Sequence, residues 1–144
     1  MKVKIKRIDK SLPLPAYETK GAVAMDLYAR VETTIEPRSI GLIPANFIVE
    51  VPKGYAFILA PRSSTPRKHG LSKPHGIGII DQDYCGPTDE VIVQLYNFMD
   101  KPVTIARGTK IAQGMFVRVD KPTFKEVDQI AKKSRGGFGS TDKK

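Results

Sequence analysis

Short apolar segments rich in valine and isoleucine recur along the chain, and proline or glycine interrupts them at brief intervals. Several alternate apolar with polar residues, as at 3–6 and 117–119, which is the two-residue period of a half-buried strand. Many short strands with regular turn signals are typical of an all-β sandwich or barrel. Helical periodicity never lasts three turns, and residues 21–30 hold at most a short helical piece. The expected strands are at residues 3–8, 40–43, 47–51, 55–60, 90–96, 103–106 and 115–119.

The composition is that of one folded domain. A chain of 144 residues, 40% of them hydrophobic, can bury a core without disulfides or metals. Cys85 is the single cysteine, which excludes an intrachain disulfide and fits a reducing compartment. The N-terminal residues contain no signal-peptide core, and no apolar run approaches the roughly 20 residues that span a bilayer. We therefore expect a cytoplasmic protein with no membrane partner.

The chain is strongly basic, with 24 lysine and arginine residues against 15 acidic residues and a net charge of +9. This sign favours a polyanionic partner, either nucleic acid or a small phosphorylated ligand. The basic residues are scattered, and aromatic residues do not alternate with them as on a platform that binds single strands. A solvated basic surface accounts for the N-terminal cluster, so a nucleic-acid partner is not required.

The composition changes near residue 131, where a basic, glycine-rich segment begins. We therefore divide the chain into a β-barrel catalytic domain at 1–130 and a flexible C-terminal arm at 131–144. Such a segment buries too little surface to fold alone, so a disordered tail is one interpretation. The other is a lid that offers backbone amides and cations to phosphates, with Phe138 able to stack on a base. Glycines on both sides of Phe138 favour the lid.

The segment 76–86 carries the clearest chemical signal. An apolar run delivers Asp81, Asp83 and Tyr84 into a turn that Gly86 and a proline close. A base that activates water beside a flat, hydroxylated ligand needs such a grouping. The residues alone leave the two carboxylates as equal candidates, and a structural turn carboxylate is a further possibility.

Other kinds of site find no support in the sequence. The two histidines, His69 and His75, lack the spacing of a zinc pair. A calcium loop that starts at Asp81 fails because Ile92 stands where the bidentate glutamate belongs. No serine lies in a nucleophile elbow, so an acyl-enzyme mechanism is not indicated.

Five segments, taken in chain order, resemble the motifs of the trimeric all-β dUTP pyrophosphatases (dUTPases). The resemblance extends from Ala24 to Thr141. It implies a jelly-roll or distorted β-barrel subunit, a homotrimer with sites at subunit interfaces, and hydrolysis of dUTP to dUMP and pyrophosphate. That reaction keeps uracil out of DNA and supplies dUMP for thymidylate synthesis. The five segments are 24–29 (AMDLYA), 60–64 (APRSS), 78–86 (GIIDQDYCG), 107–113 (RGTKIAQ) and 136–141 (GGFGST).

By the same resemblance, Asp81 is the general base that deprotonates a water attacking the α-phosphorus. Asp26 supports the metal–phosphate region through water, and Mg²⁺ arrives on the triphosphate. In the arm, Arg135 is the favoured contact to the γ-phosphate, with Lys133 as the alternative because the glycines of the fifth motif align Lys133 with the usual arginine. The remaining phosphate contacts are Arg62, Ser63, Ser64 and Gln113.

The resemblance also implies how the nucleoside is read. Tyr84 lies against the deoxyribose and leaves no room for a 2′-hydroxyl, and Phe138 stacks over the uracil. Main-chain groups of the hairpin at about 75–80 read the base, although His75 replaces the asparagine that is frequent in the family. The hairpin contacts are assigned to Gly76, Ile77, Gly78 and Ile80.

Two other functions compete with this one. The dCTP deaminases share the fold and an Arg-Ser-Ser motif, but their catalytic glutamate lies three residues before an asparagine. Here Gln94 precedes Asn97 by three residues, and a neutral amide cannot shuttle protons. A non-catalytic binding module is the second alternative, and retention of Asp81, Arg62 and Gln113 argues against it.

Overall fold

The computed structural model describes residues 1–134 and 136, and over this part the chain is built from short antiparallel strands and one helix of five residues. The all-β prediction is therefore confirmed. The elements are β1 (Ile5–Arg7), β2 (Met25–Tyr28), β3 (Thr33–Ile35), β4 (Ile40–Pro44), β5 (Phe47–Val49), β6 (Tyr55–Ala60), α1 (Thr65–His69), β7 (Leu71–Ser72), β8 (Gly78–Ile80), β9 (Ile92–Asn97), β10 (Val103–Ile105) and β11 (Lys110–Arg118).

The helical content differs from the expectation. Residues 21–30, where the sequence allows at most a short helical piece, contain strand β2, because this segment pairs with β11 and buries Leu27 completely. The helix lies at α1 instead. Pro66 fits its first turn, and Gly70 ends it in the left-handed conformation at φ +65°.

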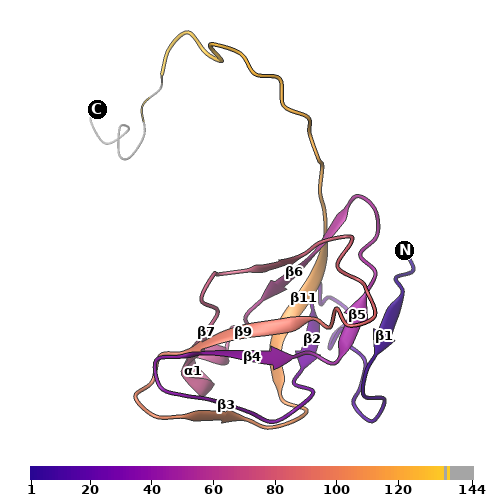
Figure 1. Cartoon of the computed structure of the whole chain (residues 1–144), viewed down its shortest axis with the longest axis vertical. Coiled ribbons are helices and arrows are strands. Elements are labelled where there is room, and N and C mark those ends of the chain that lie inside the picture. The colour runs from indigo at the N-terminus through magenta and orange to yellow at the C-terminus, as the bar shows by residue number, and fades with distance from the viewer. Residues whose placement is uncertain (135, 137–144) are drawn as a thin grey trace.

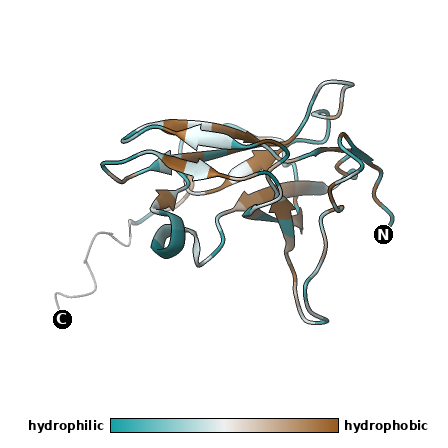
Figure 2. Cartoon of the chain, turned by 90° about the horizontal axis from the view of Figure 1, so that it is seen from below, coloured by the Kyte–Doolittle hydropathy of each residue, from teal (hydrophilic) through white to brown (hydrophobic). Residues whose placement is uncertain are grey.

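Two sheets enclose the core (Figure 1). One has the strand order β2-β11-β6-β8 and the other β4-β9-β7, and two-stranded ribbons β1-β5 and β10-β3 flank them. In Figure 2 the hydrophobic colour is concentrated on the strands, whereas the helix is hydrophilic. Phe57 is 1% exposed and makes an edge-to-face contact with Phe47, with ring centroids 6.1 Å apart. Other buried members of this core are Leu27, Leu59, Val93, Leu95, Ile105 and Ile111.

The register of the first sheet determines where side chains can meet. Gln113 in the middle of β11 pairs with Asp26 on one side and with Ala60 on the other. On the far side of β6, Gly78 pairs with Leu59 and Ile80 with Phe57. The chain therefore leaves β6 at one end of the sheet and leaves β8 at the opposite end.

Strand β11 ends at Arg118, and the chain then runs away from the sheets (Figure 1). Residues 120–134 are exposed and contain no strand or helix. The division at residue 130 stays a prediction, and Arg135 and Phe138 lie outside the described residues. No helix in the described part of the chain has the length and hydrophobicity needed to cross a membrane.

Asn97, which is fully buried at the end of β9, fixes the turns at that end of the second sheet. Its amide nitrogen donates to the carbonyls of Ile35, Glu36 and Lys101 at 2.8–3.2 Å, and its Oδ1 accepts from the main-chain N–H of Met99. We expect Asn97→Leu to lower the free energy of unfolding by about 3 kcal/mol, because buried polar groups lose their partners.

Urea denaturation at fixed protein concentration measures this effect. Gln129→Leu, a substitution of the same kind at an exposed position, is the control and should change the free energy of unfolding little. An Asn97→Leu variant as stable as that control would contradict the structural role given to Asn97.

Candidate active site

A pocket of about 290 Å³ opens beside the C-terminal end of β6, next to the start of β2 and the middle of β11. Asp26 and Gln113, which are paired across β2 and β11, line it. Pro61 has no N–H to continue the ladder, so the chain turns there and carries the following residues over the end of the sheet. The pocket brings together five predicted site residues, namely Asp26, Arg62, Ser63, Ser64 and Gln113.

Asp26 is the electrostatic centre of this pocket. Asp26 is 8% exposed and forms ion pairs with two cations, with Oδ1 at 2.9 Å from Arg62 Nε and Oδ2 at 3.0 Å from Lys110 Nζ. Lys110 also lies 2.6 Å from a carboxylate oxygen of Glu18. The hydrogen bond to Glu18, followed by that to Asp26, raises the pKa of Lys110. The two cations are therefore held in place before any ligand arrives.

The other pocket residues are positioned by the main chain. Gln113 donates from Nε2 to the carbonyl of Pro61 at 3.0 Å, which ties β11 to the turn after β6. Ser63 is exposed, and Ser64 is half-buried and starts the helix by accepting at its carbonyl from Lys68 N–H at 2.9 Å. Ser63 and the guanidinium of Arg62 thus face the open side of the pocket.

The loop after β8 carries the predicted base. Asp81 and Asp83 are both exposed. Gln82 donates to the carbonyl of Tyr55 at 2.9 Å, and the hydroxyl of Tyr84 donates to the carbonyl of Glu90 at 3.1 Å. These two bonds attach the loop to the body of the domain and leave both carboxylates on its surface.

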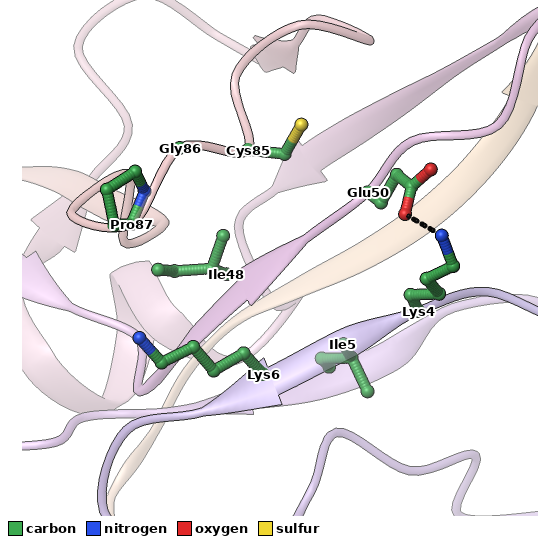
Figure 3. Close-up of a pocket in the computed structure, with 8 residues that line it drawn as sticks. All are labelled: Lys4, Ile5, Lys6, Ile48, Glu50, Cys85, Gly86 and Pro87. Atoms are coloured by element: carbon green, nitrogen blue, oxygen red, sulfur yellow. Dashed lines mark ion pairs between the residues drawn. The ribbon is translucent and has the colours of Figure 1, made fainter.

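A second depression lies beside this loop, between it and the β1-β5 ribbon (Figure 3). Lys4 and Lys6 line it on one side and Cys85 on the other. Lys4 forms an ion pair with Glu50 at 3.0 Å, but both side chains are more than half exposed, so the pair contributes little stability. Neither Tyr84 nor Asp81 lines this depression, so it is separate from the predicted base.

Asp81 does not reach the pocket of its own chain. Ile80, the residue before it, pairs with Phe57, three residues along β6 from Ala60, which is about 10 Å at the rise of a strand. Asp81 continues in the direction away from Ala60, and neither it nor Tyr84 lines the pocket. The structure therefore separates the predicted site residues into two groups at opposite ends of one sheet.

The residues predicted to read a base lie in the connection between β7 and β8. These strands pair with β9 and β6 and not with each other, so the predicted hairpin is a turn between the two sheets. Gly76 takes the left-handed conformation at φ +72°, which permits the tight turn. Ile77 N–H donates to the carbonyl of His75 at 2.8 Å, and the His75 ring lies 2.5 Å from the carbonyl oxygen of Ile77. The polar main-chain groups of Ile77 are thus engaged inside this turn. Gly78 and Ile80 belong to β8, which is an edge strand of its sheet.

Comparison with known proteins decides between the alternatives. The dUTPase family model matches residues 10–142. This chain belongs to the dUTPase family. This match confirms the assignment based on the five motifs. The matched residues include both groups of site residues.

Individual dUTPases agree with this assignment. A deoxyuridine 5′-triphosphate nucleotidohydrolase of Dictyoglomus turgidum is 40% identical over 98% of this chain and 98% of its own length. The crystal structure of the Streptococcus mutans dUTPase shares 29% identity and a TM-score of 0.77 over 83% of this chain and 98% of its own. A dUTPase variant of phage phi11 of Staphylococcus aureus, described as coordinating a structural Mg(II) ion, shares the fold at 19% identity. Its TM-score is 0.81, over 90% of this chain and 98% of that chain.

Sequence reasoning within the dUTPase motifs missed Lys110 and Glu18. Lys110 lies in the fourth motif, but the register of β11 against β2 shifts between Lys110 and Ala112. A β-bulge of this kind redirects a side chain, and nothing in the alternation of apolar residues predicts it. Glu18 lies outside the motifs, in a loop that only the tertiary fold brings to the pocket.

Proposed function

We propose that this chain hydrolyses dUTP to dUMP and pyrophosphate, through attack of a water activated by Asp81 on the α-phosphorus. One observation carries the proposal: in a member of the dUTPase family, Arg62, Ser63 and Gln113 converge on one pocket beside the carboxylate of Asp26. The net charge of +9 fits a triphosphate ligand.

The pocket is suited to phosphate. The ion pair with Asp26 joins its Oδ1 to Arg62 Nε. The guanidinium has further N–H donors that can form a bidentate contact with phosphate oxygens. The Ser63 hydroxyl and the Gln113 amide are neutral donors that add hydrogen bonds without further charge. The main-chain amide of Ser64 completes the proposed set of phosphate contacts.

The proposed reaction needs an in-line water more than it needs a covalent intermediate. Asp81 accepts a proton from the water as its oxygen bonds to the α-phosphorus. The bond from that phosphorus to the bridging oxygen breaks, and pyrophosphate leaves. The exposed position of Asp81 leaves it accessible to such a water.

Mg²⁺ fits this site as part of the substrate. Within the described residues there is no group of three or more side chains able to cage a metal, and both oxygens of Asp26 already accept from cations. A Mg²⁺ bound by the triphosphate keeps several waters, so Asp26 would hold it through water. The ion would supply neutralisation of phosphate charge.

We propose a homotrimer in which Asp81 of one subunit faces the phosphate pocket of another. The separation of the two groups of site residues supports this arrangement. So does the outer face of the first sheet, where Met115, Ile58 and Ile79 form an apolar row across three strands. Ile79 is 60% exposed in the isolated chain, and exposed apolar surface of this kind marks an interface.

The nucleoside contacts follow from the turn after β7 and the loop after β8. Tyr84, anchored through its hydroxyl, would lie against the deoxyribose and exclude a 2′-hydroxyl. The free edge of β8 offers unpaired main-chain groups to the pairing edge of uracil at Gly78 and Ile80, as an added strand would use them. Gly76 and Ile77 shape the turn that closes over the base, and this closure would refuse the methyl group of thymine.

The expected cellular setting is the cytoplasm. There the reaction removes a nucleotide that polymerases would insert in place of dTTP, and its product dUMP feeds thymidylate synthesis. The deaminase alternative predicts a different product, ammonia, from a different substrate, dCTP. Gln94, which stands where that chemistry needs a glutamate, lies half-buried on β9.

A product assay tests the reaction. With Mg²⁺, we expect dUTP alone to yield a monophosphate and pyrophosphate, and dCTP, dTTP and UTP to remain unhydrolysed.

Asp81→Asn should lower kcat about 10²- to 10⁴-fold with little change in dUTP binding, because an amide cannot accept the proton. Asp83→Asn, two residues away and equally exposed, is the matched control. Loss of turnover in Asp83→Asn but not in Asp81→Asn would assign the base to Asp83. Release of ammonia from dCTP would instead show that the chain is a dCTP deaminase.

Subunit complementation tests the shared site. Arg62→Gln and Asp81→Asn should each be nearly inactive alone. If each site takes Arg62 from one subunit and Asp81 from its neighbour, a random 1:1 assembly of the two variants regains about a quarter of wild-type activity. Two differently tagged copies of the same variant, assembled in the same way, should regain none. Absence of recovery from the mixed assembly would place both residues in sites within one chain.

The C-terminal arm is proposed to close over the site, with Phe138 on the uracil and Arg135, or else Lys133, on the γ-phosphate. Lys133 is exposed, and the other two residues lie outside the described residues. We expect deletion from Ala131 onward to reduce kcat/KM at least about 10²-fold while the unfolding temperature changes little, since a lid excludes water without supporting the core. Phe138→Ala is the narrower variant, and full activity of the truncated enzyme would rule out the lid.

A further inference from the structure

Lys73 is a buried cation in the connection that is proposed to read the base. It is 7% exposed and follows β7, in which Leu71 is fully buried and Ser72 is half-buried. This alternation directs residues 71 and 73 to the same face of the strand, toward the interior. A lysine at an interior position is rare in proteins unless its charge has a partner or a function.

The Lys73 side chain follows β7 in one sheet, and its ammonium lies close to Gly78 of β8 in the other sheet. A Cβ placed on Gly78 of β8 would lie 3.3 Å from Lys73 Nζ and 3.2 Å from the Cβ of Leu59. The ammonium therefore lies against the main chain of Gly78, on the face of β8 that Leu59 covers. A side chain at position 78 would be close to both atoms, so Leu59 or Lys73 would have to shift by a few tenths of an ångström.

Among the described residues, neither an ion pair nor a hydrogen bond joins Lys73 Nζ to another side chain. Burial lowers the pKa of Lys73, since the charged form is desolvated. A cation with little access to solvent and no side-chain acceptor costs stability, and such perturbed cations are frequent at functional sites, where a ligand can supply an acceptor.

We propose that the Lys73 ammonium donates a hydrogen bond to the O4 carbonyl of the bound uracil and thereby selects uracil over cytosine. The proposal rests on the function proposed above. Uracil presents an acceptor at position 4, whereas cytosine presents an amino donor there. A fixed ammonium would face that amino group donor to donor, and the buried charge would stay unsatisfied. The main-chain groups of β8 read the rest of the edge, so Lys73 adds a charged contact at one position.

Lys73→Met separates this role from a structural one, because methionine keeps the length of the side chain and removes the charge. We expect the variant to unfold at a higher temperature and to bind dUMP about 10- to 100-fold more weakly, the range for one hydrogen bond to a charged group. The preference for dUTP over dCTP in kcat/KM should fall by a similar factor. Lys53→Met, at an exposed lysine, should change none of these. A purely structural lysine would instead lower the unfolding temperature and leave the preference intact.

A ligand variant completes the test and does not depend on the stability of the mutant. The 4-thio analogue of dUMP keeps the N3–H donor and replaces the 4-oxygen with sulfur, a weaker hydrogen-bond acceptor. Calorimetric titration should show that the wild type loses affinity for it relative to dUMP, and that Lys73→Met binds the two alike. Equal affinities in the wild type would overturn the proposal for Lys73 while leaving dUTP hydrolysis untouched. Failure of the wild type to hydrolyse dUTP would overturn the proposed function itself.

Discussion

The backbone ladder of β11 is the constraint on which the site depends. This strand pairs with β2 and β6 at once, so the backbone ladder holds Gln113 between Asp26 and Ala60. The pairing is tight: a Cβ on Gly114 would lie 2.2 Å from the ring of Phe57, so the core packs directly against this part of the strand. Phosphate-binding side chains at one end of the sheet are thus positioned by hydrogen bonds and packing that reach into the core.

Asp26 adds the electrostatic counterpart of that ladder. Arg62 and Lys110 would repel each other in an empty pocket, and a carboxylate between them removes the repulsion and fixes both side chains. Glu18 pairs with Lys110 from the solvent side, so the two carboxylates balance the two cations. The pocket therefore offers phosphate the remaining N–H donors of Arg62 rather than a net positive charge.

The fold class and most strands were predictable from alternating residues and frequent turn signals. The resemblance to the dUTPase motifs identified the five residues that line one pocket, and their contact with phosphate stays a prediction. Lys110 was not predictable, because a bulge turns it toward Asp26. Nor could periodicity show that Arg62 and Asp81 lie at opposite ends of β6. Sequence order brings their motifs close together, but antiparallel pairing of β6 with β8 carries them apart.

The pairing of β6 with β8 also explains why stability and base recognition make opposite demands on the segment that contains β8. Strand β8 is short and lies at the edge of its sheet, so its main-chain groups remain available to a base, but the segment gains little from its own ladder. Apolar side chains that pack next to β8 stabilise this strand, and the buried Leu59 of β6 is one of them. Lys73 does the opposite at the adjacent position, where a leucine or methionine would pack without a desolvated charge. The other buried polar side chains described above, such as Asn97, have hydrogen-bond partners within the domain. Lys73 lies where a ligand carbonyl would supply the partner that the domain does not.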